Sequence, residues 1–222
     1  MPRPWALLFD LDGTLIDSIE LLLASVRYAF VGHLGRAPTR EEWIAGIGTP
    51  LVTQLRPFAA DDAELRRLVE RYRAYQREYH DSLTAPYPGV VETLRLLRAR
   101  GHPMAVVTSK GDELARRSVA HVGLAELIDD VVGCDSCSRH KPEPEPVLVA
   151  LERLGYGAHE ALFLGDSVHD VASGNAAGVV TVAALWGPFS REILARAEPT
   201  HMLEHIRALP ALIERVTASV PG

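Results

Sequence analysis

Short, largely apolar runs alternate with amphipathic stretches along most of this chain, and the alternation predicts its secondary structure. Five runs of four or five residues are too short for buried helices and predict core strands: 5–9, 104–108, 130–133, 161–164 and 179–183. Beyond residue 89, apolar residues between these runs recur at helical spacing, and each such stretch ends beside a glycine: 90–100, 112–122, 146–154 and 169–177. Repeated helix–glycine–strand units predict a parallel sheet covered by helices on both faces.

The interval between the first two predicted strands shows only helical patterns. These patterns lie on either side of a Gly- and Pro-containing break at 46–50, and the last is a long charged helix over 62–80. We therefore expect an α/β protein in which a Rossmann-like core, residues 1–15 and 87–222, carries an all-helical cap, residues 16–86, inserted after the first strand.

Composition and charge narrow the class of partner. Of the 222 residues, 47% are hydrophobic and 23% are charged, and the formal net charge is −6. These values are ordinary for a globular protein and give no electrostatic reason to expect nucleic acid or an anionic membrane. No apolar run approaches membrane-spanning length, and the first strand begins at once, so we expect no signal peptide and a cytoplasmic location. We expect a monomer or a homodimer.

Polar side chains follow the predicted strands at the points where the strands end. In an open parallel sheet, ligands bind beyond the carboxyl ends of the strands, so these side chains are candidates for one site. They are Asp10 and Asp12, then Thr108, Ser109 and Lys110, then Lys141, and finally Asp166 and Asp170. Carboxylates, hydroxyls and lysines together suit a phosphoryl group, which needs a nucleophile, a metal, hydrogen-bond donors and a cation.

Two segments give these residues a family resemblance. The run Asp-Leu-Asp-Gly-Thr-Leu at 10–15 and the run Lys-Pro-Glu-Pro-Glu-Pro at 141–146 resemble motifs of the haloacid dehalogenase superfamily. The likeness covers essentially the whole chain, and it is greatest to the branch of phosphoglycolate phosphatases and pyrophosphatases. It implies a phosphatase that acts on a small phosphorylated metabolite through an aspartyl-phosphate intermediate.

The resemblance also implies a role for each candidate residue. Asp10 would be the nucleophile, and Asp12 would protonate the leaving oxygen and then deprotonate the attacking water. Lys141 would pair with Asp10, and Thr108 and Ser109 would bind the phosphoryl oxygens. The metal would be Mg²⁺, held by the side chain of Asp10, the backbone carbonyl of Asp12, and the carboxylates of Asp166 and Asp170.

Recognition of the rest of the substrate is expected to come from the cap. The break at 46–50 is its most irregular point, and we expect this loop to face Asp10 in a closed state. Arg56 lies one or two helical turns beyond the break. We expect Arg56 or Lys110 to bind a second anionic group on the substrate.

Several other functions remain open at this stage. A pyrophosphatase or a sugar-phosphate phosphatase would share every motif, whereas phosphomutases of this fold usually carry Val or Ile at the position of Thr14. Dehalogenases lack the acid/base aspartate that stands here as Asp12. A non-enzymatic phospho-acceptor domain would need neither Asp12 nor a helical insertion.

Two further patterns are weaker signals. Cys134 and Cys137 form a Cys-x-x-Cys pair, but no second pair completes a zinc site, so reduced thiols in a loop are expected. Residues 201–205, His-Met-Leu-Glu-His, fit a zinc-protease pattern. They lie in what we expect to be a C-terminal amphipathic helix, which favours structural histidines.

Overall fold

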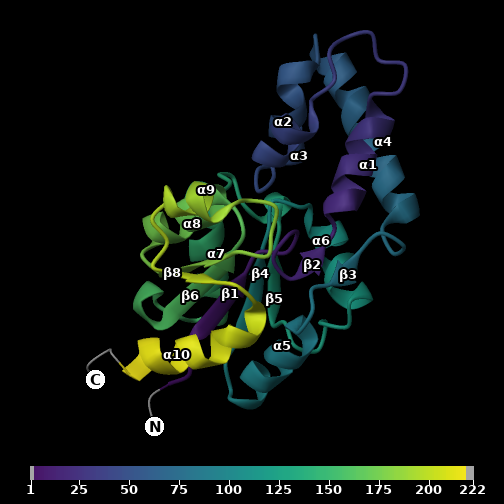
Figure 1. The fold of residues 1–222 in the computed structure, drawn as a ribbon. Coiled ribbons are helices and arrows are strands. Elements are labelled where there is room, and N and C mark those ends of the chain that lie inside the picture. Colours follow the sequence, from purple (N-terminus) through teal and green to yellow (C-terminus); the bar gives the residue numbers. More distant parts are fainter. Residues whose placement is uncertain (1–2, 219–222) are drawn as a thin grey trace.

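The protein, as a computed structural model, is described over residues 3–218 and is built on one six-stranded parallel sheet (Figure 1). The strand order is β5-β4-β1-β6-β7-β8. The strands are β1 (Ala6–Phe9), β4 (Met104–Val107), β5 (Asp130–Val132), β6 (Ala161–Gly165), β7 (Val180–Ala184) and β8 (His201–Leu203). The five strands expected from the apolar runs are all present. The predicted α/β fold is therefore confirmed.

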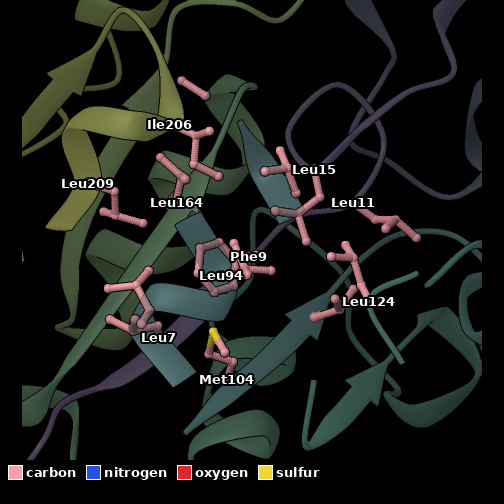
Figure 2. Packing of buried hydrophobic residues seen from close by; sticks show 14 of the residues in the cluster. Leu7, Phe9, Leu11, Leu15, Leu94, Met104, Leu124, Leu164, Ile206 and Leu209 are labelled. Carbon is pink, nitrogen blue, oxygen red and sulfur yellow. The ribbon is translucent and has the colours of Figure 1, made fainter. Parts of the chain in front are cut away.

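The central strand β1 is buried on both faces because helices cover the sheet on either side. Successive side chains of a strand point to opposite faces. Leu7 and Phe9 belong to a cluster with α5 (Val90–Ala99), α6 (Asp112–His121) and α10 (Leu209–Ala218), seen in Figure 2. Ala6 and Leu8 belong to a second cluster with α7 (Glu145–Leu154) and α8 (Val168–Ala177). Burial on both faces explains why this strand reads as a continuous apolar run.

The sheet has one strand more than the sequence patterns predict. Residues His201–Leu203 form β8, which pairs in parallel with β7 after the short helix α9 (Arg191–Ala195). The expectation that residues 201–205 lie in the C-terminal helix was therefore wrong, since that helix begins at Leu209. Three residues are too few to show a period, and sheet pairing decides their conformation.

The inserted segment is helical, with one exception at its ends. It contains α1 (Ile19–Ala29), α2 (Arg40–Ala45), α3 (Leu51–Leu55) and α4 (Asp62–Tyr79), which lie beyond one edge of the sheet (Figure 1). The exception is β2 (Ile16–Asp17), which pairs antiparallel with β3 (Ala85–Pro86) where the chain enters and leaves the segment. The expectation of no strand between 16 and 86 was wrong there. The domain boundaries at 15 and 87 remain a prediction.

The apolar residues of the helical segment pack with one another and share a cluster with residues of α8, β7 and α9. Trp43, Leu65, Leu68 and Tyr72 are buried in one cluster with residues of α1. No helix within residues 3–218 has both the length and the apolar character needed to cross a membrane.

Candidate active site

The site lies at the carboxyl end of β1, between its two neighbours β4 and β6. Phe9 pairs with Val106 on one side and with Leu164 on the other. Asp10 therefore follows the central strand of the sheet, and its backbone N–H donates to Leu164 O at 2.9 Å. The chain runs from β1 to β4 and β5 on one side and then crosses to β6 on the other, so the strand order reverses beside β1. Such a reversal is the point at which α/β folds bind ligands.

The turn after Asp10 brings Asp166 against the strand end. Gly13 adopts a φ of +89°, and a Cβ atom there would lie 2.5 Å from Asp166 Oδ2. Glycine is thus required at this position for both conformation and space. The next residue, Thr14, donates its hydroxyl to Asp166 Oδ1 at 2.6 Å. Our sequence analysis used Thr14 only to weigh phosphomutases and missed this contact.

Lys141 occupies the centre of the acidic group. Its ammonium donates to Asp10 Oδ1 at 2.6 Å, to Asp170 Oδ1 at 2.5 Å and to Val107 O at 3.0 Å. Asp10 Oδ2 has no hydrogen-bond partner within residues 3–218. Lys141 therefore orients the carboxylate of Asp10 while leaving one oxygen available to a ligand.

Three buried carboxylates form a candidate site for a divalent cation. One oxygen each from Asp10, Asp166 and Asp170 lies within 4.8 Å of the others. If all are ionised, three carboxylates and the Lys141 ammonium leave a net charge of −2 in a region where each of these residues is at most 4% exposed. Asp166 Oδ2 is also buried without a partner in the described chain. A net −2 charge and a free carboxylate oxygen fit a hard divalent cation with oxygen ligands.

The pKa values show the same unbalanced charge. Burial raises the pKa of Asp10 to about 7 despite the nearby Lys141 ammonium. Burial also raises the pKa of Asp166 well above its ordinary value, and the carboxylates of Asp10 and Asp170 add to the rise. Burial alone would lower the pKa of Lys141, but the same two carboxylates raise it instead. Protonation would relieve the repulsion among the carboxylates, and so would a bound cation.

Asp12 lies beside this group, but its carboxylate faces different partners. Its Oδ1 accepts from Ser18 Oγ at 2.5 Å and from Lys110 Nζ at 2.7 Å. Its side chain is not part of the cation cluster, so its predicted role in metal binding concerns its backbone carbonyl and remains a prediction. The two aspartates of one loop thus have separate hydrogen-bond environments, as an acid/base beside a nucleophile requires.

A chain of hydrogen bonds leads from Asp12 to the end of α4. Lys110 Nζ also donates to Ser118 Oγ at 3.3 Å, and Ser118 Oγ lies 2.7 Å from His80 Nε2. On the other side of the ring, His80 Nδ1 lies 2.6 Å from Asp81 Oδ1. Burial lowers the pKa of His80, so we assign a neutral ring with its proton on Nδ1, facing the Asp81 carboxylate. Sequence reasoning missed this chain because His80 and Ser118 belong to no recognisable motif.

The break at 46–50 docks onto the strand-end loops. Gly48 O accepts from Ser109 Oγ at 2.6 Å. Gly48 has a φ of +98°, and a Cβ atom there would lie 2.6 Å from Ser167 Oγ, so only glycine fits this contact. Thr108 and Ser109, both expected at the site, line the cavity below this loop.

The resulting cavity has a volume of about 430 Å³ and two distinct walls. The sheet face, as we call it, consists of strand-end residues: Asp10, Asp12, Thr108, Ser109 and Lys110. The helical face consists of cavity-lining residues of α2 and α4: Trp43, Tyr72, Arg73, Gln76 and Arg77. Among the expected substrate-binding residues, Thr108, Ser109 and Lys110 are brought together here.

Arg56 is not brought to the cavity. It lies in a short 3₁₀ helix (Arg56–Phe58), does not line the cavity, and donates to Asp62 Oδ1 at 2.6 Å. Its side chain is 53% exposed. Arg56 was expected to bind substrate, as an alternative to Lys110, because it lies one or two helical turns beyond the loop that was expected to face Asp10. In the structure, the chain there leads away to the start of α4, and the geometry gives Arg56 no place in the site.

The weaker sequence patterns gain no support. Cys134 and Cys137 are free thiols, and burial raises the pKa of Cys134 to about 11, which disfavours the reactive thiolate. Among the described residues, only the aspartate cluster brings three potential metal ligands together, so neither these thiols nor His201 and His205 belong to such a group.

Comparison with known proteins agrees with this geometry. Residues 7–184 match the family of haloacid dehalogenase-like hydrolases, and this match covers more than half of the chain. The chain belongs to this haloacid dehalogenase-like family. A relative from Caldanaerobacter subterraneus is 40% identical over 209 residues, covering 94% of each chain. The pyrophosphatase PpaX of Bacillus velezensis is 36% identical over 207 residues, covering 93% of this chain and 95% of its own.

Solved structures show the same haloacid dehalogenase-like fold. A crystal structure from Haemophilus somnus, described as a predicted phosphoglycolate phosphatase, has a TM-score of 0.85 at 24% identity and covers 96% of this chain and 99% of its own. The structure of a hydrolase from Pseudomonas syringae has a TM-score of 0.83 at 26% identity, with coverages of 95% and 98%. The predicted superfamily and fold are confirmed, and the chain is a hydrolase of the phosphatase type.

Proposed function

We propose that the protein is a Mg²⁺-dependent phosphatase that hydrolyses a small phosphorylated metabolite through an aspartyl-phosphate at Asp10. The observation that carries this proposal is the pairing of two aspartates from one loop at the same cavity. Asp10 is fixed by Lys141 through one oxygen, and Asp12 is held by Ser18 and Lys110. A nucleophile and an acid/base in separate environments are what a two-step phosphoryl transfer requires.

In the first step, Asp10 Oδ2 attacks the phosphorus atom and the bond from phosphorus to the leaving oxygen breaks. Asp12 donates its proton to that leaving oxygen. In the second step, Asp12 takes a proton from the attacking water, which cleaves the Asp10–phosphorus bond and releases inorganic phosphate. Both protons are accounted for, and Asp12 returns to its starting state after each turnover. Lys141 holds Asp10 in place throughout.

Asp10, Asp166 and Asp170 would hold the Mg²⁺. Two carboxylates and a phosphoryl group about 4 Å apart repel by about 4 kcal/mol per pair of unit charges at an effective dielectric near 20. A bound Mg²⁺ supplies the positive charge that offsets this repulsion. Thr14 contributes by fixing Asp166 through its hydroxyl, and Thr108, which lines the cavity, would donate its hydroxyl to the phosphoryl oxygens.

Two substrate classes fit this proposal. Phosphoglycolate-like esters are the first, because the sequence resemblance points to that branch. Pyrophosphate is the second, because relatives above 30% identity, such as the Bacillus velezensis protein, are named pyrophosphatases. Phosphate-release assays on p-nitrophenyl phosphate, phosphoglycolate and pyrophosphate, with Mg²⁺ or EDTA, test the proposal. Hydrolysis that needs the cation supports it, and no hydrolysis of any of the three substrates contradicts it.

We further propose a cytoplasmic enzyme that works as a monomer or a homodimer. Cell fractionation tests the first statement. Size-exclusion chromatography with light scattering tests the second.

A further inference from the structure

The helical face presents two adjacent rows of side chains from α4 to the cavity. Tyr72 and Gln76 are four residues apart, and so are Arg73 and Arg77, which places each pair on one side of the helix. Tyr72 and Gln76 are at most 5% exposed, whereas both arginines are exposed. All four line the same cavity as Asp10.

The two arginines differ from the other cations that line the cavity. Lys110 is bonded to Asp12, and Arg117 lies 3.0 Å from Asp81. Neither Arg73 nor Arg77 has a hydrogen-bond or ion-pair partner for its guanidinium group among the described residues. Two guanidinium groups one helical turn apart therefore remain available to an anion.

The buried part of the helical face offers further hydrogen-bond donors. Trp43 is 2% exposed, and its Nε1–H is buried without a partner within the described chain. An indole nitrogen can only donate, and a buried unpaired donor is costly, so it calls for an acceptor. The hydroxyl of Tyr72 accepts from Gln76 Nε2 at 3.5 Å, which leaves the hydroxyl proton free to donate. Burial raises the pKa of Tyr72 well above its ordinary value, so that proton is retained.

We propose that the helical face binds a second anionic group on the substrate, with Arg73 and Arg77 as the charged donors and Trp43 Nε1 as the buried donor. The substrate class is then a phosphate ester or anhydride whose leaving group carries a carboxylate or a phosphate. This inference rests on the proposed function, because it places the first phosphoryl group at Asp10.

Other charges that line the cavity leave these two arginines free. Asp135, in the 3₁₀ helix Cys134–Ser136 that follows β5, accepts from the backbone N–H of Asp112. Glu113 is exposed on α6 and has no partner in the described chain. One such carboxylate cannot neutralise two guanidinium groups, so a net positive charge remains on this side.

Single alanine variants test the assignment against a control on the same helix. Arg67 is also an exposed α4 arginine without a described partner, but it does not line the cavity. The readout is a ratio of two kcat/KM values. The first is for a substrate with a second anionic group, phosphoglycolate or pyrophosphate, and the second is for 2-hydroxyethyl phosphate, which lacks that group. We expect this ratio to fall about tenfold or more in Arg73→Ala and in Arg77→Ala. We expect it to stay within about twofold in Arg67→Ala.

The two possible second groups are separated by using phosphoglycolate and pyrophosphate in parallel. A fall confined to phosphoglycolate assigns a carboxylate, and a fall confined to pyrophosphate assigns a phosphate. Trp43→Phe keeps an aromatic ring but removes the Nε1 donor, so it should lower the same ratio. Circular dichroism and Tm confirm that each variant is folded.

Two results would overturn the inference. One is an equal loss for the charged substrates and for 2-hydroxyethyl phosphate, which would give the arginines a structural role. The other is an unchanged ratio in both arginine variants. A failure of the proposed function itself is distinct, because the unaltered protein would then hydrolyse none of p-nitrophenyl phosphate, phosphoglycolate and pyrophosphate.

Discussion

The two faces of the cavity are built on different principles. On the sheet face, charged groups are paired and held: Lys141 bridges Asp10 and Asp170, and Lys110 holds Asp12. On the helical face, the guanidinium groups of Arg73 and Arg77 have no hydrogen-bond or ion-pair partner among the described residues. A paired, buried group has a fixed position, which chemistry requires, and an unpaired donor keeps its capacity for a ligand. We therefore assign the chemical reaction to the sheet face and substrate selection to the helical face.

The largest effect should follow from removing the nucleophile on the sheet face. Asp10→Asn keeps the shape of the side chain and one acceptor for Lys141, but an amide cannot form the phosphoryl intermediate. We expect loss of nearly all phosphate release with an unchanged circular dichroism spectrum. Retention of more than about a tenth of the rate, a loss of less than 1.4 kcal/mol, would contradict the assignment.

Removal of the cation should lower phosphate release almost as strongly as replacement of the nucleophile on the sheet face. EDTA should abolish phosphate release, and Mg²⁺ should restore it. Independently of turnover, Mg²⁺ should raise Tm, since a ligand that binds only the folded state stabilises it by about 2.7 kcal/mol at one hundred times its Kd. Asp166→Asn should remove this shift, whereas Glu113→Gln, which changes a cavity carboxylate outside the cluster, should retain it.

The same Tm shift should depend on pH. Burial raises the pKa of Asp10 to about 7 in the metal-free protein. The carboxylate form binds the cation, and its fraction falls as the pH drops through that pKa. Mg²⁺ should therefore stabilise the protein more at about pH 8 than at about pH 6. A larger shift at the lower pH would contradict the proposed ligand role of Asp10.

Replacement of the acid/base should have an intermediate effect that depends on the leaving group. Asp12→Asn should lower the rate about 10²–10⁴-fold for ordinary phosphate esters. For p-nitrophenyl phosphate, whose leaving group needs little protonation, the penalty on the first step should be smaller. An equal penalty for good and poor leaving groups, measured on phosphoryl transfer, would argue against leaving-group protonation by Asp12.

A smaller effect should follow from interrupting the hydrogen-bond chain behind Lys110. Ser118→Ala removes an acceptor for Lys110 and leaves His80 Nε2 buried without its partner. We expect the free energy of unfolding to fall by about 1–3 kcal/mol, measured by chemical denaturation. An unchanged free energy of unfolding would show that these hydrogen bonds do not stabilise the fold.

The smallest effect is expected at Arg56. Because its guanidinium pairs with Asp62 away from the cavity, Arg56→Ala should change KM for phosphoglycolate and pyrophosphate by less than about twofold. A large rise in KM for these substrates alone would return Arg56 to the site and weaken the case for the helical face.

The two faces also differ in how far the sequence predicts them. Asp10, Thr108 and Asp166 come directly after apolar strands, and parallel strands bring their carboxyl ends together, so local patterns were enough to place them. Arg73 and Arg77 are two of many arginines on a charged helix, and only their position in the lining of the same cavity as the strand-end residues singles them out. Arg56 shows the same limit, because its distance along the chain from the break did not indicate that its guanidinium would pair with Asp62 outside the cavity.

Short strands were the second limit on what could be predicted from the sequence. The strand β8 has three residues and β2 has two, so neither shows a period that sequence reasoning can detect. Both are set by pairing with a neighbouring strand. The strands β1, β4, β5, β6 and β7 and the helices α4 to α8, whose apolar residues repeat over at least a turn or a pleat, were predicted to within a few residues.

The central claim is that Asp10 carries the phosphoryl group during turnover. Acid quenching of the enzyme during steady-state hydrolysis of phosphoglycolate or pyrophosphate, followed by proteolysis and mass spectrometry, tests it directly. We predict one phosphoryl group on the peptide that contains Asp10 and none on the same peptide from Asp10→Asn. Rapid turnover with that peptide unmodified, or with the phosphoryl group on another residue, would contradict the account.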